Sequence, residues 1–249
     1  METENTFGKV EGISILYRLL AGMIGGAGGA LFIFIGMILG GSLLESFSSD
    51  TVNLSPFAIF LILAVLFLST LVSNSLGTLL IGLSDRAKYS MPFRGLSQVV
   101  VVNIILFILS TPIYLIAKGI DPYLMAGVAV LHFFFSSLTS ALVYEVICAD
   151  RSRILLNIYS VVISVFIGLL VMLFFYLVSS GTNQLLLFFS VPIIIWLSIG
   201  FVGALIEYFY YQFFRIAGVD FLSIEMIQKE APLAAKPEAA EKEEWDATK

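Results

Sequence analysis

Residues 153–178, RILLNIYSVVISVFIGLLVMLFFYLV, contain no charged side chain after Arg153. An α-helix needs about 20 predominantly apolar residues to cross the hydrocarbon core of a bilayer. Similar stretches lie at 20–44, 56–82, 97–117, 122–147 and 184–210. A chain of 249 residues built largely from such stretches, with 59% hydrophobic and 12% charged residues, is not a soluble globular domain. The sequence therefore predicts an all-α fold, a polytopic integral membrane bundle of six transmembrane helices.

The basic residues predict the orientation of this bundle. Of the thirteen Lys and Arg residues, all except Lys118 fall at the two termini or near two of the loops. Lys and Arg are retained on the cytoplasmic side of a spanning helix, so both termini are expected in the cytoplasm and the bundle in the cytoplasmic (inner) membrane. The longest inner loop is SDRAKYSMPFRGLSQ, residues 84–98. The chain divides into a cytoplasmic N-terminus, a six-helix bundle and a cytoplasmic acidic tail, at 1–19, 20–215 and 216–249.

Both ends of the chain carry further information. Residues 9–20 suit either a short interfacial amphipathic helix or the entry of the first span. The opening METENTFGKVEG precedes no small-residue cleavage site, so we expect it to be retained. The net charge of −5 is concentrated in the tail, which argues against nucleic-acid binding. Residues 230–249, EAPLAAKPEAAEKEEWDATK, have too few apolar side chains to fold alone, and we expect the tail to be largely disordered.

The first span is unusually rich in glycine. Small residues spaced four apart allow a second helix to approach to backbone contact, which is how helices associate inside lipid. We therefore expect a helix-packing seam on this span. The alternative is a kinked or interrupted helix lining a cavity, because consecutive glycines weaken helical order. The expected packing positions are Gly22, Gly26, Gly29, Gly36 and Gly40.

Polar side chains inside the spans are the candidate functional residues, because they are costly to place in a membrane. The candidate intramembrane cluster is Asn74, Asn103, His132, Glu145, Asn157 and Glu207. Most of these lie in the cytoplasmic half, whereas outer halves such as LLLFFSVPIIIW, residues 185–196, offer little to a polar solute. This asymmetry argues against a polar pathway through the bundle. It favours hydrogen bonding between helices, with a shallow cavity open to the cytoplasm as the alternative.

Three ionisable candidates allow more than one role. Glu145 and Glu207 lie near the inner interface, where they could reach cytoplasmic water or pair with a nearby arginine. The arginines in question are Arg151, Arg153 and Arg215. His132 lies near the middle of its span, either as a packing histidine bonded to a neighbouring helix or as a proton-handling group.

Several kinds of chemistry are excluded by the residues that the sequence lacks. The single cysteine, Cys148, excludes an intrachain disulfide and a Cys-based metal site. One histidine cannot make the H-E-x-x-H zinc helix, and neither a phosphate-binding loop nor a G-x-S-x-G turn is present. We therefore expect no enzyme activity, no metal and no cofactor.

Two functions remain compatible with these observations. The favoured one is a non-enzymatic structural or assembly subunit that offers its inner loop and termini to a cytoplasmic protein partner, or that forms a homo-oligomer. The alternative is a transport permease. It would be a carrier of an apolar or lipid-like substrate, or the membrane subunit of an ATP-driven exporter whose ATPase is a separate chain. The latter rests only on an analogy of topology.

Overall fold

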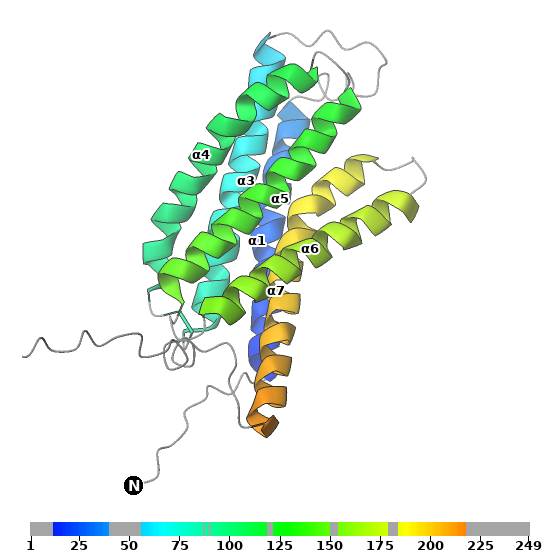
Figure 1. Cartoon of the computed structure of the whole chain (residues 1–249). Coiled ribbons are helices and arrows are strands. Elements are labelled where there is room, and N and C mark those ends of the chain that lie inside the picture. Colours follow the sequence, from blue (N-terminus) through cyan, green and yellow to red (C-terminus); the bar gives the residue numbers. More distant parts are fainter. Residues whose placement is uncertain are drawn as a thin grey trace, which may run out of the picture.

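The chain forms a bundle of long α-helices that lie side by side (Figure 1). The computed structural model describes residues 12–39, 56–86, 88–89, 91–118, 122–149, 154–178 and 184–217. Within them the helices are α1 Gly12–Leu39, α3 Pro56–Ser84, α4 Pro92–Lys118, α5 Pro122–Cys148, α6 Ile154–Val178 and α7 Gln184–Ala217. All six are long and apolar enough to cross a membrane. This confirms the predicted all-helical, six-span architecture.

Proline begins three of these helices. Pro56, Pro92 and Pro122 each occupy a first helical position, where the missing amide hydrogen costs nothing and the fixed φ suits the helix. The sequence predicted the starts at 56 and 122. The span predicted to begin at about residue 97 begins five residues earlier, at Pro92. α4 includes the charged Arg94 in its first turn, so a charged residue does not mark the start of this helix.

Two other helix boundaries differ from the prediction in the same way. α1 begins at Gly12, before the predicted span start at residue 20, and residues 12–20 form its first turns; of the two predicted alternatives for this stretch, this is the entry of the first span. α7 runs to Ala217, beyond the predicted end at residue 210. The predicted continuation of the first span over residues 40–44, and the whole acidic tail, lie outside the described residues.

Glycines bring α1 close to two neighbours. A Cβ atom on Gly22 or Gly26 would collide with backbone atoms of α7, and one on Gly29 or Gly36 would collide with α3. α1 therefore lies between α3 and α7, against which it packs extensively. It remains helical through these glycines, without the interruption that a cavity-lining role would require. Gly40 lies outside the described residues.

The two ends of the bundle differ in polarity. We call the end where α3, α5 and α7 finish the charged end, because buried acidic and basic side chains gather there. Among the described residues away from this end, the large exposed side chains are apolar. On α4 the exposed side chains include Ile105, Ile108, Leu109 and Ile116. In a bilayer such a surface faces lipid tails, which are as apolar as the side chains themselves.

Candidate functional site

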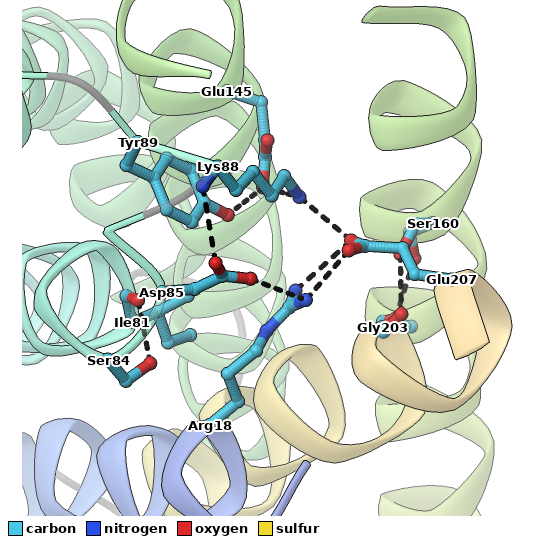
Figure 2. Close-up of polar contacts among 11 residues, drawn as sticks. Arg18, Ile81, Ser84, Asp85, Lys88, Tyr89, Glu145, Ser160, Gly203 and Glu207 are labelled. Carbon is cyan, nitrogen blue, oxygen red and sulfur yellow. Dashed lines mark hydrogen bonds and ion pairs between the residues drawn. The ribbon is translucent and has the colours of Figure 1, made fainter. Parts of the chain in front are cut away.

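A group of polar side chains is buried at the charged end, and Figure 2 shows how they converge. They come from α1, from the connection between α3 and α4, from the last turn of α5 and from the C-terminal half of α7. We call this group the charged cluster. Its members are Arg18, Asp85, Lys88, Tyr89, Glu145 and Glu207.

The strongest contact in the cluster joins α1 to α7. Arg18 donates from both Nη atoms to the two carboxylate oxygens of Glu207, at 2.8 and 3.2 Å. Both residues are 2% exposed. Two parallel charge-assisted hydrogen bonds fix the relative position of two groups more firmly than a single contact. Breaking a buried pair by removing one partner leaves an uncompensated charge, so this pair fixes the register of α1 against α7.

Lys88 joins the α3–α4 connection to two helices. Its Nζ donates to Glu145 Oε1 on α5 at 3.1 Å and to Glu207 Oε1 on α7 at 2.8 Å. Asp85 shapes the preceding turn by accepting from the backbone amide of Lys88 through its side chain and its carbonyl, at 3.2 and 3.1 Å. The turn therefore directs one ammonium group between two carboxylates.

Tyr89 holds the same connection against α5. Its hydroxyl donates to Glu145 Oε1 at 2.5 Å, and its backbone forms an antiparallel bridge with Ala149. Burial raises the pKa of the Tyr89 phenol well above its usual value of 10.0, and the charge of Glu145 adds to this effect. The phenol therefore keeps its proton at neutral pH and remains a donor to the carboxylate.

A second, uncharged group lies deeper in the bundle and surrounds Asn74. The Asn74 side-chain amide donates to Asn103 Oδ1 at 2.7 Å and to Ser136 Oγ at 3.2 Å. Its oxygen accepts from Ser137 Oγ at 2.8 Å and from the indole N–H of Trp196 at 3.1 Å. These bonds use both donors of the amide and both lone pairs of its oxygen.

The same group continues through Asn103. Its amide donates to the Val99 carbonyl at 2.8 Å and to Ser140 Oγ at 2.9 Å. We call the whole group the amide network, and it connects α3, α4, α5 and α7. Its members are Asn74, Asn103, Ser136, Ser137, Ser140 and Trp196.

The remaining candidate residues lie apart from both groups. His132 Nδ1 lies 2.9 Å from Ser110 Oγ and links α5 to α4. The same serine hydroxyl is 3.1 Å from the Phe107 carbonyl, which competes for its single hydrogen. Asn157 is buried on α6. The structure thus divides the candidates named from the sequence into separate groups.

The environment of the two glutamates differs from the expectation. Glu145 and Glu207 are buried instead of open to water, and their observed cationic partners are Lys88 and Arg18. The arginines named from the sequence are not among the described side chains: Arg151, Arg153 and Arg215.

Sequence reasoning missed several members of these groups. Arg18 served only as a marker of orientation, although an arginine inside an apolar helix is itself a signal of a buried partner. Lys88 gave no such signal, because its acceptors lie 57 and 119 positions away in the chain. Trp196 was interpreted only as part of the apolar stretch 185–196, although a buried indole N–H usually donates to an acceptor.

The geometry defines a class but not a family. Six described helices that are long and apolar enough to span a bilayer make this a multi-pass membrane protein. No protein-family model, curated protein or solved structure matches the chain.

Proposed function

We propose that this protein is a non-enzymatic structural or assembly subunit of the cytoplasmic membrane, with the charged end and both termini in the cytoplasm. In this role the bundle is a stable support, and the surface of its charged end binds a cytoplasmic protein partner. The orientation follows from the distribution of Lys and Arg.

The saturation of Asn74 is the observation that supports this proposal best. Its amide makes bonds to three other helices and has no donor or acceptor left for a solute. A transport pathway needs polar groups that are free to replace the solvation of the substrate. The bonds of Asn74 join helices, which supports a structural role for this side chain.

The charged end also presents a surface that suits a partner. Arg86 and Arg94 are exposed there, together with Met91 at 56% and Phe93 at 67%. Basic and apolar side chains in one area can contribute both specificity and buried area to an interface, and Arg, Met and aromatic residues are enriched in interfaces.

This proposal is tested by altering that surface and leaving the interior intact. In a deletion strain with a scored phenotype, we expect Arg86→Glu and Arg94→Glu to lose complementation at normal membrane abundance. The lipid-facing Ile108→Ala is the matched control and should complement fully. Full complementation by both charge reversals would contradict a partner-binding role for this surface.

The orientation has its own test. In a Cys148→Ser background, single cysteines at Ser49 and Thr182 should react with an impermeant thiol reagent in intact cells, whereas one at Arg86 should not. Labelling at position 86 would overturn the proposed topology.

A transport permease is the second candidate, and the charged cluster favours it. The cluster joins α1, α5 and α7 through ion pairs at one end of the bundle, where an opening to the cytoplasm would have to separate them. Transport would then depend on Glu145 and Glu207 themselves, independently of how much protein is present.

A further inference from the structure

The α3–α4 connection is attached to the bundle by the buried Tyr89 and by Lys88, which lies nearer to the surface. The structure describes Asp85, Arg86, Lys88, Tyr89 and Met91 of this connection. Lys88 inserts its ammonium between carboxylates of α5 and α7, with Nζ 4.9 Å from the centre of the Tyr89 ring. The connection therefore covers the charged end, where the ion pairs of Lys88, the buried Tyr89 and the Met91 carbonyl hold it.

Exposure changes from one side of the charged cluster to the other. The side chains of Lys88 and Asp85 are 12% and 15% exposed, whereas those of Arg18 and Glu207 are 3% exposed. Lys88 thus lies at the solvent edge, and its flexible stem lets the ammonium withdraw into water. Arg18 and Glu207 have no comparable route to solvent.

Withdrawal of Lys88 would leave the helices paired. Glu207 has two cationic partners, so the two hydrogen bonds from Arg18 remain when Lys88 leaves. Glu145 would keep the Tyr89 hydroxyl until the connection lifts, and its Oε2 already has no hydrogen-bond partner among the described residues. The cluster therefore contains a fixed half, Arg18 with Glu207, and a half that can be released.

We propose that the α3–α4 connection is a latch, which Lys88 closes by bridging Glu145 and Glu207, and which opens without unfolding the bundle. Opening would admit water to Glu145 and Glu207 and change the surface that the charged end presents. The latch goes beyond the proposed function, because an opening of this kind would serve a regulated partner surface or a permease equally.

Cys148 provides a native reporter of the latch. It is the only cysteine in the chain. It is 1% exposed, and its thiol donates to the Met91 carbonyl of the connection at 3.3 Å. A buried thiol reacts only when the structure around it opens, so its labelling rate reports the free energy of local opening.

The experiment compares rates of Cys148 labelling by N-ethylmaleimide in the purified, full-length protein in detergent. We expect Lys88→Met to label at least about tenfold faster than wild type, which corresponds to about 1.4 kcal/mol less opening free energy. Lys88→Arg retains a cation and should stay within about twofold of wild type.

Asn103→Leu is the control for global instability, because it weakens the amide network and leaves the latch intact. It should lower the unfolding temperature with a smaller increase in labelling than Lys88→Met. Equal labelling of Lys88→Met and wild type would overturn the latch, as would an equal increase in Asn103→Leu. If Lys88→Met does not fold, the test uses the wild-type protein, whose rate of Cys148 labelling is compared with its rate of global unfolding. Labelling faster than unfolding supports the latch, and labelling at the unfolding rate contradicts it.

Discussion

The charged cluster and the amide network both join helices, but they use different chemistry at different depths. The amide network is neutral, and both of its asparagine amides have all their groups bonded to protein. The charged cluster mixes three carboxylates with two cations, and two of its buried atoms, Arg18 Nε and Glu145 Oε2, lack a partner among the described residues.

This difference shows how position decides what a polar group can do in a membrane protein. A saturated neutral group inside the bilayer has no better alternative than its present partners, so it stays bonded and fixes the packing. The Lys88 ammonium is more exposed than the Arg18–Glu207 pair, so it can exchange a carboxylate for water more readily than Arg18 can. The amide network is therefore suited to fixed helix packing, and the part of the charged cluster around Lys88 is suited to exchanging its contacts.

The largest effect should come from Glu207→Leu, which leaves the Arg18 guanidinium buried without its carboxylate. We expect a loss of about 3 to 5 kcal/mol in the free energy of unfolding, the cost of removing one partner from a buried pair. Denaturant unfolding in detergent measures it, with Glu207→Gln as a control that keeps a hydrogen-bond acceptor. A loss below about 1 kcal/mol would mean that water solvates the Arg18 guanidinium in place of Glu207. The Arg18–Glu207 pair would then not be the fixed half of the cluster.

Asn74→Leu should have the next largest effect, because it removes four hydrogen bonds between helices. At about 0.6 kcal/mol each, the average for such bonds in a membrane protein, the loss is about 2 kcal/mol. Ser137→Ala removes one of these bonds and should cost about a quarter as much. The same unfolding assay measures both variants. Equal losses of stability would show that the other three hydrogen bonds of Asn74 contribute nothing.

Lys88→Met should reduce global stability less than Glu207→Leu does, by about 1.4 to 3 kcal/mol, because Glu145 loses its cation but Glu207 keeps Arg18. The Arg18–Glu207 pair stays in place in this variant. Thermal unfolding of Lys88→Met beside Lys88→Arg measures the effect. A loss as large as that of Glu207→Leu would remove the distinction between the two halves of the cluster.

Much of the architecture was predictable from the sequence. Long apolar runs specify spanning helices directly, since a bilayer leaves the backbone no other way to satisfy its hydrogen bonds there. Pro56 and Pro122 predicted two helix starts correctly, because proline is favoured at the first position of a helix whatever the rest of the fold. Other boundaries were less accurate, as the early start of α4 at Pro92 and the long end of α7 show.

The candidate site was predictable only in part. Asn74, Asn103, Glu145 and Glu207 stood out because polar groups are costly inside apolar helices. Their partners did not, since contacts such as that of Lys88 with Glu207 join distant parts of the chain and depend on how the helices pack. Composition identifies which residues need partners, whereas the fold decides which partners they receive.

The proposed structural role implies that the intramembrane polar side chains hold the bundle together and that function depends on them only through the amount of folded protein. The most direct test measures complementation of a deletion strain against membrane abundance for Glu145→Gln, Glu207→Gln and Asn103→Leu. For a structural subunit, we expect all three variants to follow the single relation between abundance and complementation that wild type defines when it is expressed at graded levels. A Glu207→Gln protein of normal abundance and stability that fails to complement would contradict the structural role and support the permease.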